Sequence, residues 1–171
     1  LTRGGMDGMM WTVSMGLAAL AFGGVMDAAG MLQTVSEMLL KFAKGTGSLV
    51  TVAVLTCILV NIVAADQYLA ILLPGRMYKE AYEDRKLAPK NLSRCLEDSA
   101  TLTSNFVPWN TCGATMRTFL SVGSGYIPYA VLNWINPLIS IFYGFTGISM
   151  TKMTDEEYAK ILEAREAEKE A

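Results

Sequence analysis

The sequence predicts an all-α membrane protein, a polytopic bundle of transmembrane helices with one interrupted or re-entrant polar segment. Of the 171 residues, 52% are hydrophobic and 18% are charged, a balance more apolar than that of ordinary soluble domains. The charges are also unevenly spread, because residues 9–26, 45–65, 99–116 and 118–151 contain no Asp, Glu, Lys or Arg. A hydrocarbon core roughly 30 Å thick needs about 20 apolar helical residues to cross it. These stretches therefore predict four membrane segments within residues 1–150.

The first predicted span covers about residues 9–26 and contains three glycines, which let membrane helices approach closely. In the following residues, 30–44, apolar and polar side chains recur at helical spacing, as in an amphipathic helix at a membrane interface. We expect this part to connect two spans along the surface.

The second predicted span, residues 48–75, is the most apolar run of the chain. With a rise of about 1.5 Å per residue, one straight helix of this length exceeds the hydrocarbon core. The sequence therefore predicts a tilt or a break, the break lying between Asn61 and Gln67.

Two charged regions predict the orientation. Residues 76–98 contain six Lys and Arg residues and are predicted to form a cytoplasmic loop, because short basic loops stay in the cytoplasm. Residues 151–171 are rich in charge, and Thr154 followed by Glu157 is typical of a capping box. We expect a cytoplasmic helical tail there. On this basis the span 9–26 runs outward and the span 48–75 runs inward.

The last two segments differ from each other. Residues 99–123 are rich in Ser, Thr and Asn and contain Pro108, so an interrupted helix or a re-entrant hairpin is favoured over a straight span. Residues 126–150 form an apolar run bracketed by aromatic residues, as at membrane interfaces, with a kink predicted at Pro137.

Asp66 is the leading candidate for ion binding. It follows 21 uncharged residues, 45–65, and has Gln67 beside it and Asn61 close by. An ionisable group at membrane depth is costly and is retained where it pairs, lines water or functions. Oxygen ligands suit a hard cation such as Na+, and a carboxylate can also carry a proton. The alternative interpretation is that Asp66 caps a helix or marks the cytoplasmic end of the span.

A second group of polar residues surrounds Pro108. Interrupted transporter helices expose backbone carbonyls and helix ends near the middle of the membrane, so these residues are candidates for an ion path. The alternative is that their side chains only hydrogen-bond neighbouring helices. The group consists of Thr101, Thr103, Ser104, Asn105, Trp109, Asn110 and Thr111.

Several function classes are excluded by the sequence. The net charge is −2 with no basic cluster, which argues against nucleic-acid binding. There is no His, and no nucleophile motif or phosphate-binding loop, so we expect neither an enzyme nor a bound cofactor. The three cysteines have neither CxxC spacing nor an even count; Cys57 and Cys112 are expected only to pack.

Three long motifs carry a resemblance to a known family. NIVAADQYLAILLPGRMYKEAY (61–82), APKNLSRCLEDSATLTSNFVPWNTCGA (88–114) and PYAVLNWINPLISIFYGFTGI (128–148) closely resemble the C-terminal part of NhaC-type Na+/H+ antiporters. The resemblance implies an ion-transporter fold with inverted repeats and interrupted helices, of which this chain is one half-repeat. It supports Asp66 and Gln67 of the DQY motif, and Trp109, Asn110 and Thr111 of PWNTCGA, as ion-path residues.

The resemblance also implies the function and the partners. We expect exchange of Na+ for H+ across the cell membrane, in a lipid bilayer, together with a preceding part of the same protein. Assembly of several copies into a homo-oligomer is a further alternative. Some relatives in this family exchange malate or lactate, so a Na+-linked organic-acid exchanger is the alternative, and a scaffold without transport is a third interpretation.

Overall fold

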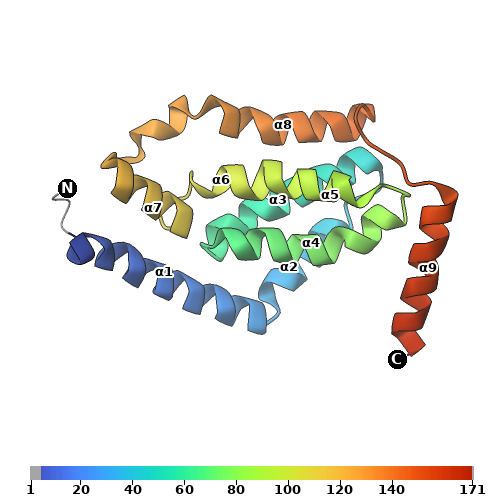
Figure 1. The fold of residues 1–171 in the computed structure, drawn as a ribbon, viewed down its shortest axis with the longest axis horizontal. Coiled ribbons are helices and arrows are strands. Elements are labelled where there is room, and N and C mark those ends of the chain that lie inside the picture. The colour runs from blue at the N-terminus through green and yellow to red at the C-terminus, as the bar shows by residue number, and fades with distance from the viewer. Residues whose placement is uncertain (1–4, 171) are drawn as a thin grey trace.

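The computed structural model describes residues 5–170, and this part of the chain is helical, with one isolated β-bridge outside the helices. Figure 1 shows the helices lying side by side, with α9 set across one end of the bundle. In chain order the elements are α1 (Gly5–Ala28), α2 (Met31–Leu40), α3 (Thr46–Val63), α4 (Gln67–Glu83), α5 (Pro89–Leu96), the π-helix η1 (Glu97–Thr101), α6 (Leu102–Ser104), α7 (Thr111–Leu120), the 3-10 helix η2 (Ser124–Tyr129), α8 (Val131–Thr146) and α9 (Asp155–Glu170).

The apolar run 48–75 is a helical hairpin and not a single long span. α3 ends at Val63, the chain reverses, and α4 runs back along α3, so the break lies where the sequence predicts it. A buried hydrogen bond of 2.6 Å joins Thr56 of α3 to Tyr78 of α4. The single span predicted for residues 48–75 is therefore wrong, because its two halves run in opposite directions. Hydropathy cannot detect such a reversal, because both arms of a hairpin are apolar.

The range 76–98, predicted as a loop, is mostly helical. α4 continues to Glu83 and α5 begins at Pro89, which leaves only residues 84–88 as a connection. α5 is strongly amphipathic and buries Leu92, Cys95 and Leu96, and this explains why its charges do not prevent helix formation. The start of α3 also lies at this end of the bundle, since Arg85 donates a hydrogen bond to the carbonyl of Ala43.

α5, η1 and α6 follow one another without a gap, so the polar segment predicted to begin at residue 99 begins inside a helical rod. The helical path stops at Ser104 and resumes at Thr111. The sequence predicts an interruption in this region, around Pro108.

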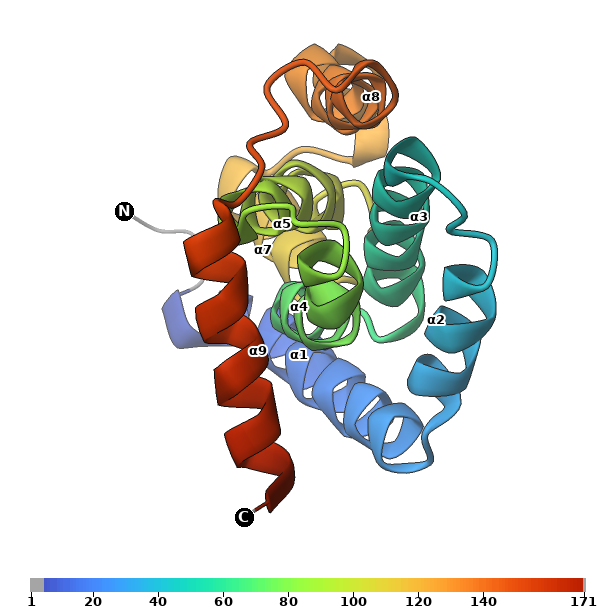
Figure 2. The same ribbon diagram turned by 90° about the vertical axis from the view of Figure 1, so that its right-hand side faces the viewer.

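α8 packs closely on α3, because two glycines bring the helices together. A Cβ on Gly47 would lie 2.5 Å from the Phe145 ring, and one on Gly144 would lie 2.8 Å from Val50. α3 also contacts α2, α4 and α5, so the core is built around it (Figure 2). Among the described residues α3 is the one helix that is both long and apolar enough to cross a membrane.

The charged tail folds back on the end of the bundle. The predicted capping box is confirmed, because Thr154 N–H donates to Glu157 at 2.9 Å and Glu157 N–H donates to Thr154 at 3.3 Å. In α9, Arg165 binds the carboxylates of Glu83 and Asp84 at the end of α4. Tail and α4–α5 connection thus lie together (Figure 1).

The buried Thr56–Tyr78 bond gives a test of the hairpin. Tyr78→Phe removes one partner, while the Thr56 hydroxyl keeps its bond to the Val52 carbonyl. We expect a loss of about 1 kcal/mol in the free energy of unfolding, the usual value for a hydrogen bond. Tyr68→Phe is the control, because Tyr68 is 71% exposed. Denaturant unfolding measures both variants, and equal free energies of unfolding for Tyr78→Phe and Tyr68→Phe would contradict the hairpin contact.

Candidate functional site

The two interruptions of the helical path meet in space. The reversal between α3 and α4, residues 64–66, touches the non-helical segment 105–110 that precedes α7. Thr111 N–H donates to the carbonyl of Ala65 at 3.1 Å, and the Trp109 indole donates to the carbonyl of Ile62 at 2.8 Å. The Ile62 carbonyl is one that the end of α3 leaves free, and the Ala65 carbonyl belongs to the reversal that follows it. We call this meeting point the crossing.

Asp66 lies at the crossing as the N-cap of α4. Its Oδ1 accepts a hydrogen bond of 3.0 Å from Leu69 N–H, and the residue is only 8% exposed. Within the part of the chain that the structure describes, no group donates to its second carboxylate oxygen. The cap predicted as an alternative role is therefore present, and it leaves one oxygen available for a ligand.

The backbone turns sharply just before Asp66. Ala65 has φ 55°, in the left-handed region, and Asp66 is extended. A non-glycine residue in that region costs about 1–2 kcal/mol, a cost that neighbouring contacts must offset. One such contact comes from α1, since a Cβ on Gly23 would lie 3.0 Å from the Ala64 carbonyl oxygen.

Asn61 and Asn110 hold the two chain segments together. Asn61 is fully buried; its amide donates to the Ala100 carbonyl at 2.7 Å and to Thr103 Oγ1 at 3.1 Å, and its Oδ1 accepts from Asn110 at 3.1 Å. The Asn110 Oδ1 in turn caps α7 by accepting from Cys112 N–H at 3.0 Å. Because these oxygens are already hydrogen-bonded, the geometry supports a positioning role for both residues.

Gln67 connects α4 to both sides of the interruption. Its Oε1 accepts from Ser104 Oγ at 3.1 Å and from the Cys112 thiol at 2.7 Å. Cys112 was expected only to pack, so its place beside Gln67 corrects that expectation. Its position directly after Asn110 and Thr111 is the signal that sequence reasoning overlooked.

The remaining candidates lie at different distances from the crossing. Asn105 faces α8, where its Oδ1 accepts from Asn133 at 3.2 Å. Thr101 bonds to Glu97 at 3.1 Å on an outer face of the rod and is not brought to the crossing by any contact. Thr111 stands at the crossing through its backbone, and Trp109 is half exposed beside it.

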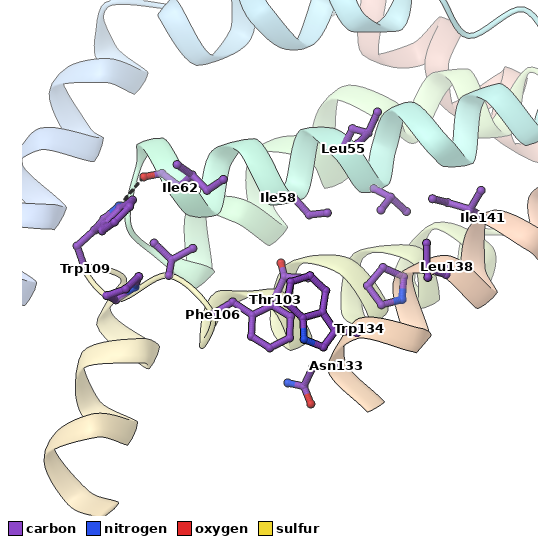
Figure 3. Close-up of a pocket in the computed structure, with 14 residues that line it drawn as sticks. Leu55, Ile58, Ile62, Thr103, Phe106, Trp109, Asn133, Trp134, Leu138 and Ile141 are labelled. Carbon is purple, nitrogen blue, oxygen red and sulfur yellow. Dashed lines mark hydrogen bonds between the residues drawn. The ribbon is translucent and has the colours of Figure 1, made fainter. Parts of the chain in front are cut away.

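An apolar cavity of about 480 Å³ opens between α3, the 106–109 segment and α8. Figure 3 shows Trp109 at one end, hydrogen-bonded to α3, and Phe106 against Trp134; these two rings stack with centroids 4.3 Å apart. The other walls include Ile58 and Leu138. A cavity this apolar does not provide the oxygen ligands that a cation needs.

Helix ends of opposite partial charge meet at the crossing. The C-terminal ends of α3 and α6 and the N-terminal ends of α4 and α7 converge there, so partial charges of both signs are present. No group of three or more His, Cys, Asp or Glu side chains gathers within residues 5–170. A cation at the crossing would therefore meet one carboxylate and neutral oxygen atoms.

Comparison with known proteins adds to this geometry. Residues 1–148 match the Na+/H+ antiporter family. The chain is 37% identical over 153 residues to the Na+/H+ antiporter NhaC of Alkalihalophilus pseudofirmus and 39% identical over 146 residues to NhaC of Bacillus subtilis. It is 30% identical over 148 residues to the malate-2H+/Na+-lactate antiporter of Bacillus subtilis.

These matches cover 89%, 85% and 86% of this chain, and 33%, 32% and 32% of the respective relatives. The chain thus spans about a third of the length of the curated relatives that it matches. No solved structure matches it significantly.

Proposed function

Because this chain belongs to the Na+/H+ antiporter family, we propose that it forms part of a membrane exchanger that moves Na+ against H+, with Asp66 binding the two ions alternately. One observation carries this proposal: a buried carboxylate stands where two interrupted helices meet, and one of its oxygens has no donor in the described structure. Interrupted helices that expose their ends near the middle of the membrane are typical ion sites of transporters.

Competition for one carboxylate is sufficient to couple the two ions. When Na+ binds the ionised form of Asp66, the proton leaves to water; when a proton returns to a carboxylate oxygen, Na+ is released. Each form is neutral as a whole, which lowers the cost of holding the group inside a membrane. The exchange needs no cofactor beyond the transported ions.

The depth of Asp66 supports this role. Arg76 is exposed on α4 ten residues after Asp66, which is about 15 Å along a helix. Arg94 of α5 lies ten residues before Ser104, a similar rise along the rod. If these two arginines lie at the cytoplasmic boundary of a hydrocarbon core about 30 Å thick, the crossing lies near its middle.

The same arrangement supports an orientation. The α4–α5 connection and the tail meet at one end of the bundle, and this end carries Arg85, Lys86 and Lys90. We place it in the cytoplasm, as short basic connections favour. α1 and α8 expose large apolar side chains, among them Leu17, Val25, Leu132 and Leu138, which lipid or the rest of the protein would cover. We propose that a preceding part of the protein, related to this one by inverted repetition as in the resembling family, completes the ion site.

Flux measurements on the complete protein test the function. In proteoliposomes we expect an imposed Na+ gradient to move protons in the opposite direction, and a pH gradient to move Na+. Empty vesicles with the same gradients are the control. Absence of coupled movement in correctly inserted protein would overturn the proposal.

A Na+-linked organic-acid exchanger is the second candidate, supported by the similarity to the malate-2H+/Na+-lactate antiporter. The same vesicles distinguish the two. Malate or lactate on opposite sides should leave the Na+-driven proton movement unchanged in a simple antiporter. In an organic-acid exchanger these anions should be required for it.

A further inference from the structure

A second acid, Asp98, lies within the helix bundle, and the proposed exchange does not use it. The sequence places this residue at the end of a cytoplasmic loop. In the structure it stands inside the π-helix η1, midway along the continuous rod from Pro89 to Ser104. η1 packs against α3, α4 and α8. A π-helical turn within an α-helical rod is rare and occurs frequently at functional sites.

Asp98 faces α8. Its Oδ2 accepts a hydrogen bond of 2.5 Å from the hydroxyl of Ser140, which is only 3% exposed. A buried serine that donates its hydroxyl hydrogen to this carboxylate is a specific partner. The other hydroxyls of the turn are used differently: Ser99 and Thr103 donate to the carbonyls of Cys95 and Ser99, which satisfies backbone groups that the π-helix displaces.

No cation pairs with Asp98 in the described structure. Arg94, one turn earlier, points elsewhere: its guanidinium donates to Ser149 and lies over the Tyr143 ring. The α6 turn carries no ionisable group. On the elements packed against η1, the ionisable residues are Cys57 of α3; Tyr68, Arg76, Tyr78, Lys79, Glu80, Tyr82 and Glu83 of α4; Lys90, Arg94 and Cys95 of α5; Glu97 of η1 itself; and Tyr143 of α8.

Asp98 lies between the cytoplasmic boundary and the crossing. Four residues separate it from Arg94, about 6 Å along a helix, and six residues separate it from Ser104, about 9 Å. Ser104 is bonded to Gln67, the neighbour of Asp66. The two carboxylates are therefore linked by one helical rod and one side-chain bond.

We propose that Asp98 is a proton-carrying residue of the exchange cycle, which takes up and releases a proton on the cytoplasmic side of the crossing. This rests on the proposed Na+/H+ exchange. One carboxylate oxygen binds the proton, which arrives from water and leaves to water, while the other accepts from Ser140. Only an O–H bond is made and broken. Protonation removes a charge that has no cationic partner in the described structure, and the ionised carboxylate keeps the hydrogen bond from Ser140.

Asp98→Asn separates this role from a structural one, since an amide oxygen still accepts from Ser140 but cannot exchange a proton. In proteoliposomes of the complete protein, we expect Asp98→Asn to remove one ionisation from the pH dependence of exchange on the side that carries α9. Ser140→Ala keeps the ionisation and should shift its midpoint. Glu97→Gln, the exposed neighbour, is the matched control and should leave the profile unchanged.

Protons released on addition of Na+ to the protein in detergent give a readout that needs no turnover. We expect Asp98→Asn to release about one proton fewer per molecule than the unchanged protein. Equal release, or an unchanged pH profile in folded Asp98→Asn, would overturn the inference. Lack of Na+-driven proton movement in the unchanged protein would instead reject the exchange function, so the two failures are distinguishable.

Discussion

Asp66→Asn should reduce Na+-driven proton movement by about 100-fold or more. Removing one partner of a buried charge pair costs about 3–5 kcal/mol, and 1.4 kcal/mol corresponds to a factor of ten. In the Na+-bound state the carboxylate is that partner, and the same change removes the proton-binding group. The measurement is coupled flux in proteoliposomes, normalised to the amount of folded, inserted protein.

The substitution is chosen because it keeps the helix cap. Asn is as good an N-cap as Asp, so its side-chain oxygen can still accept from Leu69 N–H. If Asp66 serves only to begin α4, Asp66→Asn would leave exchange and stability unchanged, and the ion-binding proposal would be rejected. Asp7→Asn, which removes an exposed acid in the first turn of α1, is the matched control and should retain full flux.

Several features of this arrangement can be predicted from short stretches of the sequence. The helical class, the break near Asp66 and the Thr154–Glu157 capping box follow from composition, run length and residue type, and the structure contains all three. The interruption around Pro108 is equally local, since proline removes a helical hydrogen bond.

The failures share one cause, because they depend on how segments pair in space. Residues 48–75 look like one span, since hydropathy is the same for a long helix and for a hairpin. Residues 76–98 look like a loop because they are charged, yet α5 buries one face and exposes the other. As a result, Asp98 was predicted to lie in a cytoplasmic loop, whereas the structure places it beside Ser140.

The candidate site shows the same division. Sequence reasoning selected polar residues near Asp66 and Pro108, and the structure brings Asn61, Gln67, Ser104, Asn110 and Thr111 together at the crossing. Sequence reasoning could not distinguish side chains whose oxygens all accept hydrogen bonds from the protein, such as Asn61, from a side chain with one oxygen that accepts none within the described residues, such as Asp66. That distinction requires the hydrogen-bond partners. The roles of these residues in transport stay predictions.

Gly113→Ala should disrupt the crossing itself. Gly113 lies in the first turns of α7, and a Cβ there would stand 2.1 Å from the carbonyl oxygen of Val107 and 3.3 Å from that of Asn105. Because both atoms are backbone, no side-chain rotation can relieve the overlap. Either α7 or the 105–110 segment must move, and overpacking of this kind costs about 3 kcal/mol, at the upper end of the usual range. We expect a lower thermal unfolding midpoint and loss of coupled flux.

Gly24→Ala is the control for this change, since it adds the same methyl group to a helix where no atom lies within 4 Å of the new Cβ. Alanine favours helix over glycine by about 1 kcal/mol, so this variant should be as stable as the unchanged protein or slightly more so. Equal unfolding midpoints for Gly113→Ala and Gly24→Ala would mean that α7 does not approach Val107 so closely. Asn110 and Thr111 lie between Val107 and Gly113 in the chain and join the reversal through Asn61 and Ala65, so the placement of α7 at the crossing, on which the proposed ion site depends, would then be contradicted.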